Sequence, residues 1–353
     1  MAQKKIPYLK LVEPPEDIRE VRKKGRKIKR KKAEKILVTA VLAALAVCGT
    51  YLLLKNETYG QARKASGYTN EISDSNSYIR FGNGIVRYSR DGVVFLNRKN
   101  EEQWIQSAQI QNPIIEVNDD TFAVADSGGN SILVFTEDGL KGEIETTLPI
   151  EKISVSNQGI VSAILRNENI LVEQQASLSS TGYPVALEMS DDGNELAVSY
   201  VYTVGTQIRS RVVYYNFGEA GQAKADNIVA SDVYQGTVMA DIFYMGSSRS
   251  VVVGDNSFAV YSCGEVPEKQ QEVTLDQEIK SVFHSDRYIG LILLNQEKSG
   301  YEVRLYDRSG NLMLSRAITG DYSNVRIDGD EIIMFDGSRC CIVTATGVVK
   351  FQG

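Results

Sequence analysis

A short β-rich segment recurs along the chain at a spacing of about forty residues. Each copy is an apolar run, usually closed by a turn that contains Gly, and the copies centre on Phe95, Phe135, Val172, Tyr215, Tyr261, Tyr306 and Val343. Short strands between close turns are typical of sandwiches, barrels and propellers alike. A period near forty residues with four strand-sized pieces per unit favours the propeller, with one blade per unit.

The sixth unit shows the four pieces most clearly, at residues 279–284, 288–295, 301–307 and 311–318. Gly, Asn and Asp lie in the short connections, where they suit hairpin turns. A single blade would leave two apolar faces uncovered, and packing blade against blade in a ring buries them. We therefore predict an all-β, seven-bladed β-propeller over residues 77–353, with six or eight blades as the alternatives.

Two units depart from the common pattern. Residues 150–183 contain only three clear strand segments before a turn-rich stretch, so we expect a short or three-stranded blade there. Residues 198–217 form one long run of strand-favouring residues around Gly205, which predicts a hairpin that projects beyond its blade.

Residues 36–54 contain no charged side chain and are long enough to cross a bilayer as a helix. Residues 1–35 carry fourteen Lys or Arg against five Asp or Glu, and such flanking charge keeps this end in the cytoplasm. A cleaved signal peptide is the alternative, but its charged and apolar regions would be unusually long. Val47 before Cys48 argues against a lipoprotein, because a small residue normally precedes the lipidated Cys.

We thus expect a basic cytoplasmic tail (1–35), a transmembrane helix (36–54), a polar stalk (55–76) and an extracytoplasmic propeller (77–353) in a single-pass plasma membrane protein. The lipid bilayer is the predicted partner of residues 36–54. From residue 55 onward, 25 Lys or Arg face 40 Asp or Glu, which gives −15 and disfavours nucleic acid as a partner.

No catalytic or metal-binding constellation is visible. His284 is the single histidine, on the predicted inner strand of the sixth blade, so neither a serine nor a cysteine triad nor a zinc site is indicated. Cys340 and Cys341 resemble the adjacent cysteines of quinoprotein dehydrogenases. Neighbouring strand residues point to opposite faces, however, and Trp104 is the single tryptophan. We predict no catalytic, cofactor-binding or metal-binding residue.

Acidic residues are plentiful, but Asp91, Asp138, Asp192 and Asp336 each precede Gly in a predicted turn, which explains them without chemistry. Tyr183, Tyr200, Tyr202 and His284 are the residues that we assign to a candidate interaction surface, since tyrosine is favoured at interfaces. Packing between blades is the alternative role for the three tyrosines.

The order of segments along the chain resembles that of a known family. A basic tail and one span are followed by GIVRYSRDGVVFLN, Trp104, Asn112-Pro113, FAVADSGGNSILVF, GYPVALEMSDDGNELAVSY, RVVYYNF and EVRLYDRSG. It is similar to an uncharacterised family of membrane-anchored β-propellers of Gram-positive bacteria, a domain of unknown function, over essentially the whole chain. The short third unit departs from the family pattern. The turns of the Tyr-Asp-x-x-Gly type also resemble those of quinoprotein-like and Trp-Asp-repeat-like propellers. The resemblance implies fold and topology and carries no catalytic residues.

Taken together, these features favour a non-catalytic binding scaffold in the bacterial cell envelope, with an envelope protein, a glycan or a peptide as partner and no cofactor. Two alternatives remain. One is a polysaccharide-active enzyme, which needs two carboxyl groups converging at the mouth of the channel. The other is a ligand sensor coupled to a cytoplasmic partner.

Overall fold

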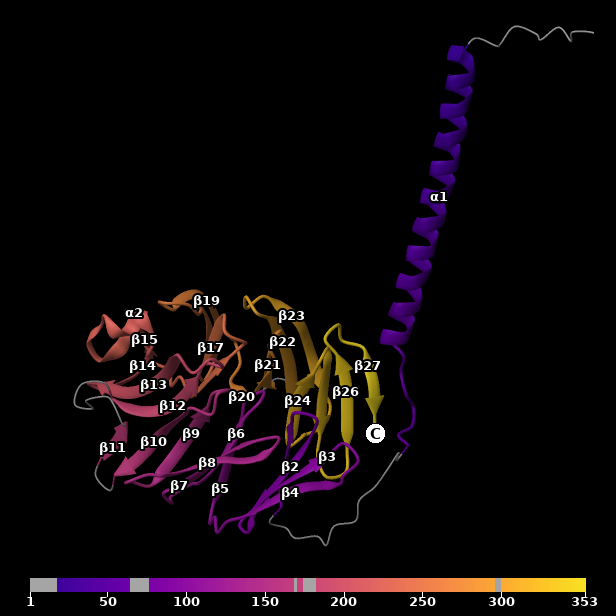
Figure 1. Cartoon of the computed structure of the whole chain (residues 1–353). Helices are drawn as coiled ribbons and strands as arrows, with labels where there is room; N and C mark the ends of the chain where they lie inside the picture. The colour runs from indigo at the N-terminus through magenta and orange to yellow at the C-terminus, as the bar shows by residue number, and fades with distance from the viewer. Residues whose placement is uncertain (1–17, 64–75, 168–169, 174–181, 296–299) are drawn as a thin grey trace, which may run out of the picture. The chain divides into compact units, whose positions relative to one another are not determined.

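The computed structural model describes residues 18–63, 76–167, 170–173, 182–295 and 300–353 (Figure 1). The chain forms two compact units, residues 1–59 and 60–353. The predicted stalk falls largely on residues 64–75, which lie outside the described part.

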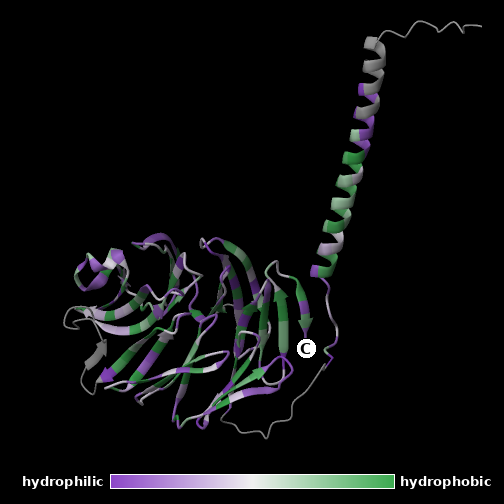
Figure 2. Cartoon of the chain, in the orientation of Figure 1, coloured by the Kyte–Doolittle hydropathy of each residue, from purple (hydrophilic) through white to green (hydrophobic). Residues whose placement is uncertain are grey.

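The first unit is the helix α1 (Ile18–Lys55). It covers the predicted span and continues back through the basic segment, where the Lys and Arg side chains are compatible with helix. In the described part of the chain, one helix is long and apolar enough to cross a membrane, over Arg30–Lys55. Figure 2 shows its apolar residues in the half that ends at Lys55. By length and composition this segment suits a membrane anchor or a signal sequence.

The second unit is all antiparallel sheet, and each sheet follows the chain order of its strands. The first sheet contains β1 (Ser77–Phe81), β2 (Gly84–Ser89), β3 (Gly92–Asn97) and β4 (Glu102–Ser107). The second contains β5 (Pro113–Val117), β6 (Phe122–Asp126), β7 (Ser131–Thr136) and β8 (Gly139–Glu145). The third contains β9 (Ile150–Val155), β10 (Val161–Asn167) and β11 (Ile170–Glu173).

The fourth sheet contains β12 (Tyr183–Met189), β13 (Glu195–Val204), β14 (Gln207–Asn216) and β15 (Ile228–Gln235), with α2 (Glu219–Gln222) and a 3-10 turn (Ala225–Asn227) before its last strand. The fifth contains β16 (Asp241–Tyr244), β17 (Arg249–Val253), β18 (Ser257–Ser262) and β19 (Glu268–Thr274). The sixth contains β20 (Ile279–His284), β21 (Tyr288–Asn295), β22 (Gly300–Asp307) and β23 (Leu312–Ile318). The last contains β24 (Asn324–Asp328), β25 (Glu331–Phe335), β26 (Cys340–Thr344) and β27 (Val349–Gln352).

These sheets are the blades of a β-propeller, and the strand assignments of the sequence analysis are largely confirmed. The stretch 122–139 supplies β6 and β7, the middle strands of one blade. The long hairpin is present as β13 and β14, of ten residues each. Cys340 and Cys341 occupy opposite faces of β26: Cys341 is buried among apolar residues, whereas Cys340 is half-buried.

The blade count differs from the prediction of seven. Six sheets have the four strands of a complete blade, whereas β9, β10 and β11 form a three-stranded sheet. A reduced blade was expected over 150–183, and the described residues provide no fourth strand there. Residues 174–181 lie outside the described part.

Apolar clusters join neighbouring sheets and form the core. In the first of them Phe122 packs against Phe135 with ring centroids 4.8 Å apart and against Phe81 at 4.7 Å. Six such clusters join the sheets in chain order, from the first pair to the last. Among the described residues, no comparable cluster joins the last sheet to the first.

Contacts between first strands join β5 to β9, β9 to β12, β12 to β16, and β20 to β24, which places these strands innermost. An ion pair, from Arg80 of β1 to Asp328 of β24, links the innermost strands of the first and last sheets. The inner strands therefore surround a common axis, and their carboxyl ends lie at one face of the propeller.

Candidate binding site at the channel mouth

A cavity of about 470 Å³ opens where the inner strands end and their first hairpin turns begin. Five blades contribute to its wall, through Phe81 of β1, Val117 of β5, Glu188 of β12, Tyr244 of β16 and His284 of β20, together with the turns that follow. Because every repeat runs its first strand in the same direction, residues far apart in sequence converge here. We call this cavity the channel mouth.

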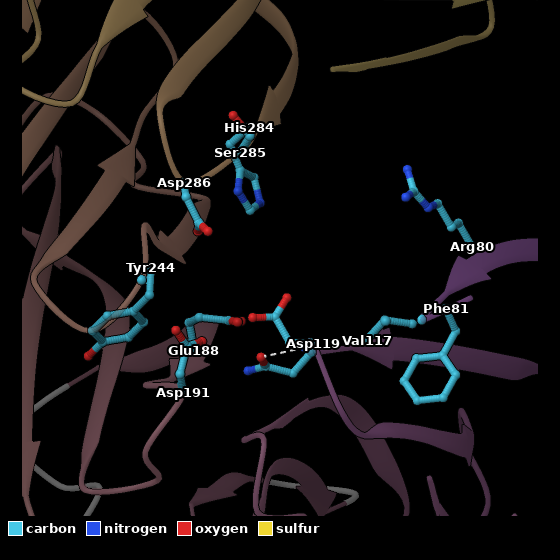
Figure 3. A pocket seen from close by; sticks show the side chains of 13 residues that line it. Arg80, Phe81, Val117, Asp119, Glu188, Asp191, Tyr244, His284, Ser285 and Asp286 are labelled. Carbon is cyan, nitrogen blue, oxygen red and sulfur yellow. Dashed lines mark hydrogen bonds between the residues drawn. The ribbon is translucent and has the colours of Figure 1, made fainter. Parts of the chain in front are cut away.

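Four carboxylates line the channel mouth: Asp119, Glu188, Asp191 and Asp286. Figure 3 shows the side chains of Glu188, Asp119 and Asp286 directed into the same space, with the ring of His284 beside them. None of the four takes part in an ion pair with a described Lys or Arg. Arg80 also lines the cavity, but its guanidinium is paired with Asp328.

Burial and mutual repulsion disfavour the charged forms of these carboxylates. Desolvation, followed by the charges of Asp286 and Asp120, raises the pKa of Asp119. Desolvation also raises the pKa of Asp191, against a hydrogen bond from Asn118 that lowers it. For Glu188, desolvation raises the pKa well above its usual value, and the charges of Glu116 and Asp241 add to the effect.

Glu116 on β5 and Asp241 on β16 extend this acidic region along the inner strands. Desolvation raises the pKa of Glu116 to about 7, with Asp241 as the second cause and Lys152 opposing. The pKa of Asp241 is also raised by desolvation. Both side chains keep accessible surface and nevertheless lose much of their hydration, because a narrow channel surrounds them with protein. The Nζ of Lys152 donates a 2.6 Å hydrogen bond to the carbonyl oxygen of Val185.

His284 stacks on Phe243 of β16, with ring centroids 4.0 Å apart and planes 8° from parallel. The imidazole keeps surface toward the cavity, while protein surrounds its other sides. This desolvation lowers the pKa of His284 to about 4 despite the charge of Asp286. At neutral pH the ring is uncharged, so it supplies a donor and an acceptor but no positive charge.

The arrangement can do two things chemically. It presents several incompletely solvated carboxylates to one space, which attracts an organic cation. It also places carboxyl groups with raised pKa values close together, as acid–base catalysis requires. Within the described ranges, no group of three or more His, Cys, Asp or Glu side chains is arranged to hold a metal ion.

The four residues assigned to a candidate interaction surface do not lie together in the structure. His284 lies in the channel mouth. The prediction for Tyr200 is wrong: the side chain is 0% exposed, and its hydroxyl lies 2.8 Å from that of Tyr215. Neighbouring sheets cover both faces of this part of β13, so Tyr200 packs between blades. Tyr183 is 60% exposed, and Tyr202 is half-buried with Arg211 5.3 Å above its ring. Neither lines the channel mouth.

The sequence analysis missed the acidic residues of the channel mouth. Their signal is an Asn or Ser followed by Asp directly after an inner strand: Asn118-Asp119 in the second sheet, Ser190-Asp191 in the fourth and Ser285-Asp286 in the sixth. Each Asp is explained locally by a turn, so the pattern emerges only when the blades are superimposed.

An N-terminal apolar helix followed by a ring of antiparallel blades defines the class: a β-propeller protein with a candidate membrane anchor. A family model described as "Family of unknown function (DUF5711)" matches residues 55–353, so the chain belongs to that family. No curated protein matches the sequence significantly.

The chain is similar to several solved structures. Sqt1 of Saccharomyces cerevisiae aligns with a TM-score of 0.51 at 13% identity, over 79% of this chain and 88% of that one. Hydrazine synthase of Kuenenia stuttgartiensis has a TM-score of 0.49 and 13% identity, over 80% of this chain and 99% of that one. BamB of Moraxella catarrhalis has a TM-score of 0.48 and 10% identity, over 78% and 87%. At these identities the similarity extends to the fold alone.

Proposed function

We propose that the chain is a non-catalytic, extracytoplasmic binding scaffold of the bacterial cell envelope, held by one transmembrane helix with its N-terminus in the cytoplasm. Charge supports this topology, because the basic residues precede the apolar part of α1 and cytoplasmic flanks are rich in Lys and Arg. We count the three-stranded sheet as a reduced blade of a seven-bladed ring.

The topology is tested with an epitope added after Gly353. In intact spheroplasts, antibody should bind this epitope, while an epitope added before Met1 should require detergent. The reverse pattern would contradict the proposed orientation. Loss of the N-terminal epitope from the mature chain would identify a cleaved signal sequence instead.

The channel mouth is the proposed binding site, and its ligand is a cationic group on a peptide or glycan partner. The observation that carries this proposal is the convergence of Asp119, Glu188, Asp191 and Asp286 on one cavity without a described Lys or Arg paired to them. A bound cation would relieve their repulsion and replace lost hydration.

Binding is tested with the full chain in phosphatidylcholine nanodiscs and a labelled hexalysine peptide as the probe. The double variant Asp119→Asn/Asp286→Asn should weaken binding about tenfold, as expected for losing two attractive charges. Asp138→Asn is the matched control, since Asp138 is an exposed turn residue outside the cavity lining. Equal binding by wild type and the double variant would exclude this site.

The second candidate function is carboxylate-assisted hydrolysis of a polysaccharide. It is favoured by the raised pKa of Glu188 in a cavity that Asp119, Asp191 and Asp286 also line, since glycosidases combine a protonated acid with a second carboxyl group. Turnover of a purified envelope polysaccharide that Glu188→Gln abolishes, with folding retained, would establish the enzyme and refute the scaffold.

A further inference from the structure

A second cavity, of about 730 Å³, lies between the first and last sheets. Its wall contains the turn after β1, the turn after β3 and residues of β24, including Arg98, Lys99 and Arg326. We call it the seam cleft. It occupies the junction at which the described residues form no apolar cluster between neighbouring sheets.

The seam cleft is basic, although the chain from residue 55 onward has a net charge of −15. Arg80, Arg98, Lys99 and Arg326 line it, against the single carboxylate of Asp328. Asp328 pairs with Arg80. The guanidinium of Arg98 donates a 2.9 Å hydrogen bond to Oδ1 of Asn83. In the described part of the chain, neither Arg98, Lys99 nor Arg326 forms an ion pair, so three positive charges remain uncompensated.

An incompletely covered apolar row continues from this basic lining. Arg326 pairs in register with Ile333, which pairs with Ile342 and then with Phe351. Directly opposed residues share one face of a sheet, so these side chains face the seam with Arg326. All three are half-buried and belong to none of the six clusters. The guanidinium of Arg326 lies 5.5 Å from the ring centre of Phe335.

From this combination we infer that the seam cleft is a docking site for an acidic, apolar segment of a partner protein. Carboxylates of the segment would pair with Arg98, Lys99 and Arg326, and its apolar side chains would cover Ile333 and Phe351. Charge complementarity selects this occupant, because a simple anion would satisfy the basic residues and leave the apolar row uncovered. The site adjoins the acidic channel mouth, because Arg80 and Gly82 line both cavities, and it has the opposite charge preference.

The experiment uses the full chain in phosphatidylcholine nanodiscs and a labelled peptide rich in Glu and Leu. Binding is compared for the wild type, Arg98→Gln, the double variant Arg98→Gln/Lys99→Gln and Arg90→Gln. Arg90 is the matched control: it is an exposed arginine in the turn between β2 and β3, at the opposite end of the same blade. The two variants at residues 98 and 99 remove exposed side chains, so the fold should be retained.

The double variant should weaken binding about tenfold and Arg98→Gln by a smaller factor, while Arg90→Gln should bind like the wild type. Replacing Leu by Ser in the peptide should also weaken binding. The inference is overturned if the peptide does not bind, if Arg90→Gln loses as much affinity as Arg98→Gln, or if inorganic phosphate or the Ser peptide competes equally well. Hexalysine binding in the same preparation reports separately on the channel mouth.

Discussion

The guanidinium of Arg80 lies 2.8 Å from the carboxylate of Asp328, and this contact joins the inner strand of the first blade to that of the last. The two side chains are 59% and 58% exposed. Elsewhere, neighbouring sheets are held by apolar clusters, whose burial stabilises far more than an exposed ion pair. Among the described residues, no apolar cluster of this kind joins the first sheet to the last.

We predict that Asp328→Asn lowers the free energy of unfolding by less than about 1 kcal/mol, because the pair is exposed. The variant should have a larger effect on the local opening of the strands that the ion pair joins. Amide hydrogen exchange in β1 and β24 should accelerate in the variant, while exchange in β17 and β18 should stay unchanged. Uniform acceleration across all blades would show that the junction does not open independently.

Phe122 tests the packing between the first two blades. Its ring is 0% exposed and contacts Phe81 and Phe135. Phe122→Ala should lower the stability by about 3–5 kcal/mol, the usual cost of truncating a buried aromatic ring. Leu140→Ala, at an exposed position in the same blade, should cost less than about 1 kcal/mol. Chemical denaturation measures both, and similar losses would contradict the assigned core.

Tyr200 and Tyr183 should respond oppositely to loss of the hydroxyl. Tyr200→Phe removes the buried hydrogen bond between the hydroxyls of Tyr200 and Tyr215 and should cost about 0.5–1.5 kcal/mol. Tyr183→Phe removes an exposed hydroxyl and should change stability by less than about 0.5 kcal/mol. Thermal unfolding distinguishes the two, and an unaffected Tyr200→Phe variant would contradict the buried assignment.

Glu116 should make stability depend on pH. Its pKa is about 7 in the folded state against 4.5 as the reference, so the folded protein binds the additional proton between these values. Stability from this group is thus present at low pH and is lost as the pH rises from about 4.5 to 7. Glu116→Gln should remove this loss, with a gain at pH 8 of about 1–2 kcal/mol after allowance for channel water.

The measurement is the difference in unfolding free energy between Glu116→Gln and the wild type at several pH values. His284 acts in the opposite direction, because its pKa is lowered to about 4 and protonation in acid destabilises the fold. Subtracting the curves cancels this contribution. A difference that does not grow between pH 5 and pH 8 would contradict the raised pKa of Glu116.

Much of the fold could be predicted because each repeat is defined by short strands and turns that depend on neighbouring residues. Strand lengths and turns around Phe135, Tyr261 and Tyr306 are set by neighbouring residues, and even the reduced blade at 150–183 was visible as missing strand signal. The start of α1 at Ile18 was not predicted from the sequence. Lys and Arg are compatible with helix, so no local signal marks whether the helix stops at the edge of the apolar segment.

The candidate site was less predictable because it depends on which strand is innermost and on contacts between blades. Asp119 and Asp191 are ordinary turn residues in the sequence, and only the ring places them in one cavity. His284 was recognised because the chain has a single histidine. Tyr200 was assigned to a surface because the sequence does not show that neighbouring blades cover both faces of β13.

The central claim is that carboxylates of the channel mouth receive a cationic group, and proton release tests it most directly. Because desolvation raises the pKa values of Asp119 and Glu188, a bound cation should stabilise their charged forms and expel protons. Calorimetry of hexalysine binding in buffers of different ionisation enthalpy near pH 6 should show release from the wild type and less from Glu188→Gln. Binding without any dependence on the buffer, or equal release from both proteins, would contradict the claim.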